Sequence, residues 1–194
     1  MGRTVADAAL LLAAQAGGNR RDPLSLRSSP DLSLPLKATE LGTLRVAFSV
    51  DLGAAPVERR IREVFSDKVQ QFRHVFAETQ ERNPDLGPVH EVFEIIRGVN
   101  FVAAHGEHVK HHRAKLGTNV VDNTERGLAL SAADIAWAQV EQSKLYRRVT
   151  DLFDEVDILI CPAAAVSLFP HEQLYVEEID GEKIPTYMRW LAVT

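Results

Sequence analysis

Hydrophobic residues recur at helical spacing in four stretches of the chain. Over residues 57–76 and again from about residue 88, apolar side chains stand three or four positions apart and would line one face of a helix. Residues 131–156 repeat this pattern behind a serine and an aspartate spaced as in a capping box. Residues 4–16 begin with a similar cap and are then apolar almost all round. The pattern predicts four helices, of which those over residues 57–76 and 131–156 are expected to be long.

Two short segments have the pattern of strands. Apolar and more polar side chains alternate over residues 44–50, as they do in a half-buried strand. Residues 157–162 are almost wholly apolar and end in a proline, which favours a strand buried on both faces in the middle of a sheet. Between these segments, Asn83-Pro84 is expected to end the helix that starts near residue 57, because proline disfavours helical geometry in the residue before it.

The elements near the two ends of the sequence lack obvious partners. A short helix that is apolar all round is expected to be buried, and a new apolar segment begins at residues 191–194. Two strands alone make no stable sheet. We therefore expect a helix-rich α/β fold in which residues 1–194 are part of one larger domain, truncated at both ends. Exposed sheet edges would then favour aggregation of the isolated chain.

Composition excludes some classes of function. The formal net charge is −5 and the basic residues form no large cluster, so nucleic-acid binding, which needs such a cluster, is not expected. Cys161 is the single cysteine, which rules out an intrachain disulfide and favours a reducing, cytoplasmic location. The apolar run at residues 8–14 is too short to span a bilayer, so we expect no membrane association.

Histidines offer two candidate metal sites. His105, His108 and His112 would share one side of a helix, where neutral imidazoles can bind zinc. Basic neighbours would repel a cation, however, so a solvated helix end is the favoured interpretation. Residues 90–94 resemble a zinc-protease motif but carry a glutamate where the second histidine should stand, and they are interpreted as the polar side of a helix. No metal and no cofactor is expected.

Candidate nucleophiles are equally sparse. Ser28, Ser29 and Lys37 supply the residue types of serine–lysine catalysis. They lie in a proline-rich stretch without a glycine-rich turn to direct backbone N–H groups at an oxyanion, so turn formation is favoured. Cys161 follows an apolar strand, where thiols are usually inert, but the carboxyl ends of strands in open α/β sheets face ligand crevices. We interpret Cys161 as a pocket-wall residue rather than a nucleophile.

Several segments, taken in order, resemble the amidase signature family. Arg3–Leu12 is similar to the helix that follows the family's nucleophile region, and Phe153–Pro162 to its late core strand, where threonine is commoner than Cys161. The resemblance covers nearly the whole chain and rests on order and spacing rather than on one motif. Its further segments are Asn83–Leu86 with Val92-Phe93 and Ile96-Arg97, Asn123–Asp134, Phe169-Pro170, Glu178–Gly181 and Tyr187–Trp190.

This resemblance implies a mixed central sheet covered by helices and the hydrolysis of a carboxylic amide to acid and amine. In the family, a serine attacks the carbonyl, a second serine with an unusual cis peptide relays the proton, a lysine is the base, and backbone N–H groups hold the oxyanion. That region precedes the helix matched to Arg3–Leu12, so we expect no catalytic residue in this chain and an inactive segment on its own.

The resemblance also implies what surrounds the substrate. It places Cys161, Pro162, Phe169 and Trp190 near a small-molecule amide in the complete enzyme, with no cofactor. Packing in the core or in loops is the competing interpretation of each residue. A homodimer stays open. The alternative function is a non-catalytic interaction subunit, or a fragment derived from an amidase, that docks on another chain through its apolar ends.

Overall fold

The computed structural model of the protein describes residues 2–22, 25, 36 and 38–191. It separates into two units, Met1–Glu40 and Leu41–Thr194, which are described here each by itself. The candidate residues Ser28, Ser29 and Lys37 lie outside the described residues, as does most of the apolar segment at 191–194.

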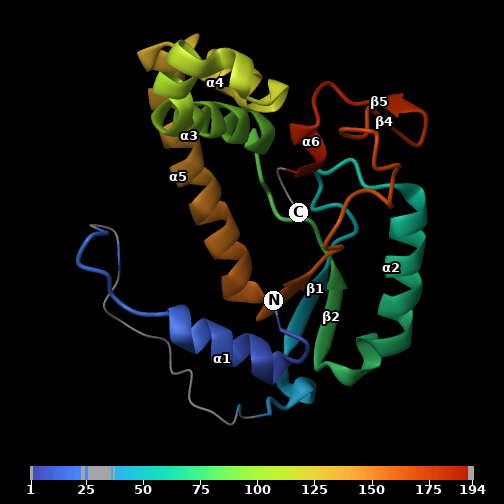
Figure 1. Cartoon of the computed structure of the whole chain (residues 1–194). Coiled ribbons are helices and arrows are strands. Elements are labelled where there is room, and N and C mark those ends of the chain that lie inside the picture. The colour runs from blue at the N-terminus through green and yellow to red at the C-terminus, as the bar shows by residue number, and fades with distance from the viewer. Residues whose placement is uncertain (1, 23–24, 26–35, 37, 192–194) are drawn as a thin grey trace. The chain divides into compact units, whose positions relative to one another are not determined.

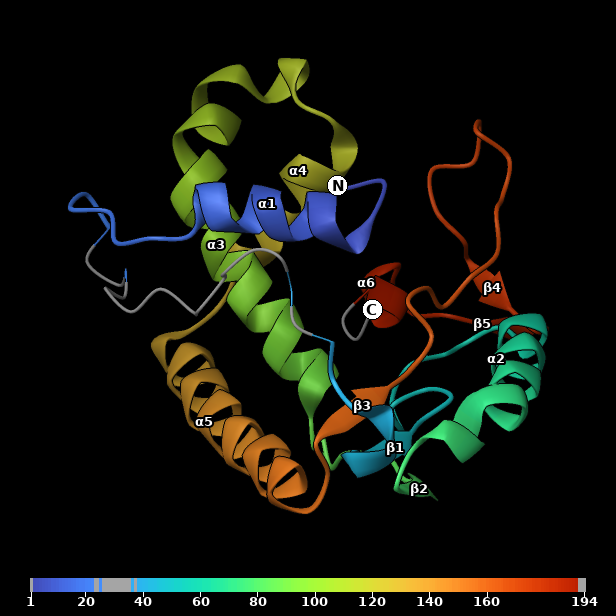
Figure 2. The same cartoon turned by 90° about the horizontal axis from the view of Figure 1, so that it is seen from below.

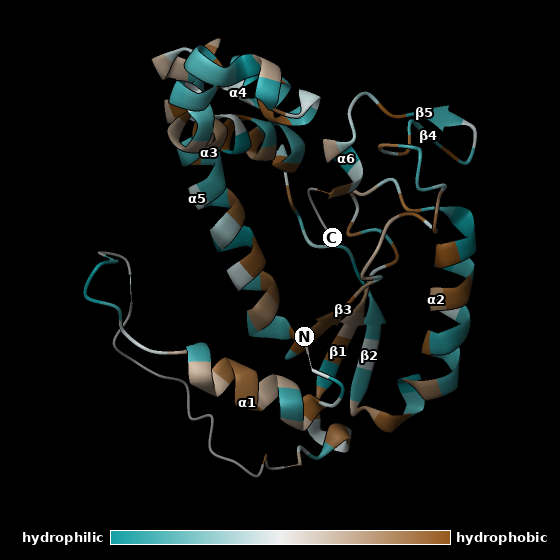
Figure 3. Cartoon of the chain, in the orientation of Figure 1, coloured by the Kyte–Doolittle hydropathy of each residue, from teal (hydrophilic) through white to brown (hydrophobic). Residues whose placement is uncertain are grey.

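The first unit contains one helix, α1 (Val5–Gln15), in its described part. The predicted cap is confirmed, because the Thr4 hydroxyl oxygen accepts a hydrogen bond from the backbone N–H of Asp7 at 3.1 Å. The prediction that this helix is buried is wrong for the described chain. None of its residues is buried, and Val5 is 76% exposed. Figure 3 shows hydrophobic residues along α1, and the described part of this unit offers no second helix or strand to cover them.

The second unit is built on a parallel sheet with the strand order β2-β1-β3, which confirms the α/β class (Figure 1). The strands are β1 (Arg45–Phe48), β2 (Glu78–Glu81) and β3 (Ile158–Ile160). Helices α2 (Arg59–Phe72) and α5 (Ala132–Glu155) cover opposite faces of the sheet (Figure 2).

The central strand β1 is buried on both faces. Val46 and Phe48 pack with Val69 of α2 on one face, where the Phe48 ring also contacts two further phenylalanines edge-on or tilted. On the other face, Ala47 packs with Leu152 of α5 and with Val156, which directly follows this helix. The alternation predicted one buried face, but the intervening Ala47 is small and apolar and fits equally well under a helix.

The two outer strands differ from the sequence-based expectation. Strand β2 was not predicted, because its residues are polar and mostly exposed and follow a helix almost directly. Strand β3 was predicted to lie in the middle of a sheet. It lies at one end of the described sheet instead, and Ile158 is 37% exposed. An apolar run shows only that a strand can be buried on both faces. Which strands lie beside it depends on the rest of the fold.

Helices α3 (Val89–His112) and α4 (Thr118–Leu128) pack against each other at a pair of glycines. A Cβ atom on Gly98 would lie 3.0 Å from the Cα atom of Gly127. A Cβ atom on Gly127 would overlap the Gly98 carbonyl group and lie 2.7 Å from a methyl carbon of Val102. The two backbones can approach this closely only because neither residue has a side chain.

The helices predicted from about residue 88 and from residue 131 are confirmed as α3 and α5. The helix predicted from residue 57 is confirmed as α2, but it ends at Phe72 rather than at Asn83-Pro84, because the residues between them form a 3-10 turn and strand β2. Several short elements complete the unit. Ser131 and Asp134 form the predicted capping box of α5, with reciprocal bonds of 2.8 and 3.2 Å. The other elements are the 3-10 turns η1 (Leu41–Thr43), η2 (Arg73–Val75) and η3 (Arg113–Lys115), the antiparallel hairpin β4 (Glu178–Ile179) with β5 (Glu182–Lys183), and α6 (Met188–Leu191).

An ion pair joins the starts of β1 and β3. The backbone N–H of Arg45 donates to Asp157 Oδ2 at 2.8 Å, and the Arg45 guanidinium donates to Oδ1 at 2.9 Å. These bonds lower the pKa of Asp157 from 3.8 to about 2, with the hydrogen bond from the Arg45 side chain as the largest cause.

The glycine contact between α3 and α4 can be tested with a matched pair of alanine variants. Gly127→Ala is expected to destabilise the protein by about 3 kcal/mol, because backbone atoms must move to admit the methyl group. Gly106→Ala is the control within α3, since its Cβ would meet only a side-chain atom at 3.8 Å. It should be neutral or stabilising by up to ~1 kcal/mol. Urea unfolding measures both, and equal midpoints for the two variants would contradict the close contact.

The Arg45–Asp157 pair predicts a stability that depends on acid pH. The folded pKa of Asp157 lies below its ordinary value, so the unfolded chain binds more protons between about pH 2 and 3.8. The contribution of Asp157 is therefore fully present above about pH 4 and is lost as the pH falls toward 2. Asp157→Asn should lower the urea midpoint at pH 7 and flatten this acid dependence, whereas the exposed Asp67→Asn should leave both unchanged.

Candidate functional site

Three loops meet at the carboxyl edge of the parallel sheet, where open α/β folds bind ligands. Ser49, directly after β1, is 2% exposed and connects all three. Its backbone N–H donates to the Ile160 carbonyl of β3 at 3.0 Å, and its hydroxyl donates to Asn83 Oδ1, after β2, at 2.7 Å. The hydroxyl oxygen also accepts from the Leu52 N–H at 2.7 Å. Ser49 thus holds the loops in place. Its hydroxyl hydrogen is donated to the side-chain amide of Asn83 and not to a general base.

The loop after β3 packs on the loop after β1. The Glu58 N–H donates to the Ala165 carbonyl at 2.8 Å, and the Glu58 carboxylate accepts from the Ser167 N–H at 2.7 Å. Ala165 is fully buried with Ala55 and Val57. Trp190, on α6, packs against the same cluster, so the end of the described chain covers the junction of the two loops.

The four predicted pocket-wall residues are only partly brought together. Cys161 and Pro162 are half-buried directly after β3, and burial raises the pKa of the Cys161 thiol, which disfavours the thiolate that a nucleophile needs. Trp190 packs against the buried cluster that includes Ala165, in the loop that these two residues begin. Phe169 lies farther along that loop and is 37% exposed. None of the four lines the cleft that opens beside them.

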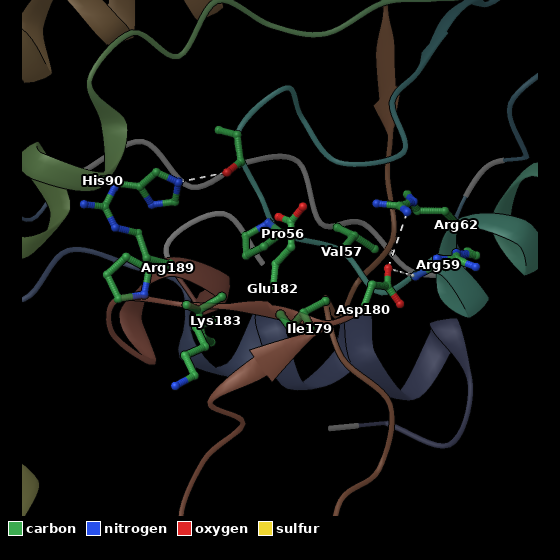
Figure 4. A pocket seen from close by; sticks show the side chains of 13 residues that line it. Pro56, Val57, Arg59, Arg62, His90, Ile179, Asp180, Glu182, Lys183 and Arg189 are labelled. Carbon is green, nitrogen blue, oxygen red and sulfur yellow. Dashed lines mark hydrogen bonds and ion pairs between the residues drawn. The ribbon is translucent and has the colours of Figure 1, made fainter.

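That cleft has a volume of about 510 Å³, within the range of small-molecule sites (Figure 4). It lies between the loop after β1, the starts of α2 and α3, the β4–β5 hairpin and α6. Its charged and polar lining residues are Arg59, Arg62, His90, Asp180, Glu182, Lys183 and Arg189, so cations outnumber carboxylates.

Asp180 fixes the hairpin that forms one wall of the cleft. Its carboxylate accepts a hydrogen bond of 2.7 Å from the backbone N–H of Arg59 at the start of α2, where the helix dipole favours a negative charge, and it lies 3.4 Å from the Arg62 guanidinium. Asp180 and Gly181 both have positive φ, as two-residue hairpin turns require. No hairpin is predicted here from the sequence, although an Asp-Gly pair is a strong hairpin signal.

His90 and Arg189 lie near each other at the opposite end of the cleft (Figure 4). The Nε2 atom of His90 lies 2.8 Å from the Ala54 carbonyl oxygen, which can only accept, so Nε2 carries the proton. His90 is therefore half-buried in a wall of the cleft, whereas the sequence indicated merely the polar side of a helix. The Arg189 guanidinium lies 3.5 Å from Glu91 and 3.3 Å from Glu94, which hold it against α3.

A polar network holds the segment before α6 against α3 and α4. Arg97 donates to Asn123 Oδ1 at 3.0 Å and to the Tyr187 hydroxyl oxygen at 3.3 Å. Asn123 donates to the same hydroxyl oxygen at 2.9 Å and to the Asn119 carbonyl at 2.6 Å. These three side chains come from segments that resemble the amidase signature family, but sequence reasoning did not connect them, since no local pattern links positions so far apart.

The histidine metal sites find no support in the structure. The His105 ring packs beside Phe101 with ring centroids 5.4 Å apart, and His111 pairs with Glu107 at 3.2 Å. Within the described residues, no three His, Cys, Asp or Glu side chains converge as metal ligands would. Nor does any described helix have the length and apolar character needed to cross a bilayer.

Comparisons with known proteins agree with one another. A family model described as Amidase matches residues 1–194. An acylamidase of Rhodococcus erythropolis is 24% identical over 184 residues, which is 94% of this chain and 39% of the acylamidase. This chain also matches the structure of a bacterial aryl acylamidase of the amidase signature family, with a TM-score of 0.81 and 22% identity. The match covers 97% of this chain and 41% of the aryl acylamidase chain.

A second solved structure extends the comparison. It belongs to a study of a vestigial protein complex and of the origins of an s-triazine catabolic enzyme, and it matches with a TM-score of 0.82 and 20% identity. The match covers 98% of this chain and 41% of the chain in that structure. At these identities the solved structures show the fold alone. The chain spans about two fifths of the length of the relatives it matches.

The role of Asp180 in closing the cleft wall predicts a change in proteolysis. Asp180→Ala removes the carboxylate that joins the hairpin to α2, so cleavage between residues 176 and 186 should become several-fold faster. Glu182→Ala is the control, because Glu182 lies on the same hairpin and its side chain has no hydrogen bond or ion pair to another described residue. Limited proteolysis followed by mass spectrometry locates the cut. Equal cleavage of the two variants would show that Asp180 does not hold the hairpin.

Proposed function

The chain belongs to the amidase family, and on this premise we propose that it forms the substrate-facing part of a carboxylic-amide hydrolase. The family match over residues 1–194 is the observation that carries the proposal. The reaction adds water across the bond between the acyl carbon and nitrogen, giving a carboxylic acid and an amine. We propose further that the nucleophile and its base are supplied by residues outside these 194.

The contacts at the sheet edge support this division of labour. Among the described residues, Ser49 donates to an amide oxygen and the Cys161 thiol has a raised pKa, so neither is activated for attack on a carbonyl. Instead, the loops after β1 and β3 are fixed to each other and leave a cleft beside them. The chain's own contribution is then to bind and orient the amide and to exclude water around it.

We keep Cys161, Pro162, Phe169 and Trp190 as proposed substrate-wall residues. Their support is positional: the first two directly follow a strand at the carboxyl edge, and Trp190 covers the junction of two loops there. The names of the relatives, an acylamidase and an aryl acylamidase, suggest acyl amides of aromatic amines as the substrate class to test first. A cytoplasmic location and a homodimer remain predictions.

A second candidate function is favoured by the surface of α1. Val5, Leu10, Leu11 and Leu12 are all exposed on this helix. Apolar side chains in such a cluster are typical of a surface that docks on another polypeptide. The chain would then act as an interaction subunit of the amidase family without a catalytic role.

The proposal predicts that the 194-residue chain alone does not hydrolyse amides. Aniline release from acetanilide should stay at the buffer rate, and Cys161→Ala should change nothing. Within a longer polypeptide that contains the missing reacting groups, turnover should appear. There, Trp190→Ala should raise KM about tenfold with little change in kcat, because the indole contributes to binding rather than to bond cleavage.

Three outcomes of these assays are informative. Turnover by the 194-residue chain that disappears in Cys161→Ala would overturn the proposal and make the cysteine the nucleophile. A longer polypeptide that folds but hydrolyses no acyl amide would overturn the proposed reaction. A stable complex with a second, unrelated chain, without turnover in any form, would favour the interaction subunit.

A further inference from the structure

We propose that the Tyr187 hydroxyl donates a hydrogen bond to an oxygen atom of a bound small molecule, either an amide carbonyl or a carboxylate. The argument starts from the orientation of the Asn123 side chain. Arg97 can only donate, so the atom of Asn123 that faces it must be the oxygen, Oδ1. The Asn119 carbonyl can only accept, so the atom that faces it must be Nδ2. Turning the amide over would break both bonds.

This orientation decides what Tyr187 can do. Asn123 Nδ2 donates to the phenolic oxygen at 2.9 Å, and Arg97 donates to it at 3.3 Å. The oxygen therefore accepts twice, and its own hydrogen must point to a third group. The described residues supply no acceptor for that hydrogen. A hydroxyl group with two fixed donors and no acceptor is poised to bind an oxygen ligand.

The surroundings hold the hydroxyl in this arrangement. Asn123 is 2% exposed, and the Arg97 guanidinium lies 4.7 Å from the centre of the Phe101 ring and 5.8 Å from that of Phe93. Both donors to Tyr187 are thus fixed by packing. Because one of them is charged, it polarises the O–H bond and makes the hydroxyl a stronger donor.

The hydroxyl belongs to a residue that lines a second cleft, of about 520 Å³, between the start of α4 and residues 175–188. The Tyr175 ring lies 5.4 Å from that of Tyr187 and adds an aromatic wall on which a planar group could stack. The neighbouring Thr186 also lines this cleft, although its hydroxyl oxygen is itself buried and has no hydrogen-bond partner among the described residues. The aromatic wall and the Tyr187 hydroxyl together indicate a planar ligand that carries an oxygen acceptor.

The choice of an amide as one probe rests on the proposed function, but the hydrogen bond does not, since a carboxylate would satisfy the same donor. Acid and amide share this chemistry, and labelled probes distinguish them. The ligands are acetanilide and benzoate, each with carbon-13 at the carbonyl carbon, added to the 194-residue chain. Difference infrared spectroscopy reports the carbonyl or carboxylate stretch, and calorimetry reports the dissociation constant.

For the wild-type chain, we expect the labelled carbonyl band of at least one probe to move to lower frequency on binding. Tyr187→Phe removes only the hydroxyl oxygen and its hydrogen, so this displacement should disappear and binding should weaken about three- to tenfold. Tyr146→Phe is the matched control, because that side chain is 73% exposed on α5. It should leave both the band and the dissociation constant unchanged.

A second substitution covers the case in which Tyr187→Phe fails to fold. Placing 3-fluorotyrosine at position 187 keeps both accepted hydrogen bonds and makes the phenol a stronger donor, so the band should move farther than in the wild type. A purely structural tyrosine would not produce that change. The proposal is overturned if neither probe shifts in the wild-type chain, or if a shift persists in a folded Tyr187→Phe variant.

These outcomes separate the inference from the proposed function. A shift for benzoate alone would identify the acid, and a shift for acetanilide would identify the amide. Because binding is measured without turnover, failure of the longer polypeptide to hydrolyse amides would leave these spectra unchanged.

Discussion

The burial of β1 on both faces is the constraint on which the rest of the second unit depends. Val46 and Phe48 require α2 on one face, and Ala47 accommodates α5 on the other. Since all three strands run parallel, the chain must leave them at the same edge. Loops that are far apart in sequence therefore meet there, and Ser49 joins them through hydrogen bonds that a more exposed serine would make to water instead.

Elements defined by local chemistry could be predicted from the sequence, whereas those defined by their neighbours could not. The caps at Thr4 and Ser131 identify helix starts because both partners lie within one turn. The polar residues of β2 carry no comparable signal, since that strand is specified by the backbone of β1 beside it. The exposed end of β3 was missed for the same reason: an apolar run does not reveal which strands flank it.

The candidate site divides in the same way. Resemblance to the amidase signature family indicated Cys161 and Trp190, and the structure packs Trp190 of α6 against the buried cluster that includes Ala165, in the loop that follows Cys161. The resemblance assigned no role to His90 or Arg189, because their positions in the cleft depend on a loop and a helix that the fold brings together. The Asp180 turn is a different case, because its Asp-Gly signal was present in the sequence and was not used.

The network of Arg97, Asn123 and Tyr187 is difficult to explain by stability alone. Each net hydrogen bond contributes only about 1 kcal/mol, and burying the Asn123 amide while partly burying the Arg97 cation costs a comparable amount of solvation free energy. Apolar side chains of similar volume could join α3, α4 and the segment before α6 at least as well. What apolar packing cannot do is orient a hydroxyl group. Arg97 and Asn123 can only donate to the Tyr187 hydroxyl oxygen. The hydroxyl hydrogen therefore cannot point at either of them and is directed away from the network. The geometry therefore fits a role in recognising an oxygen atom better than a role in holding the fold together.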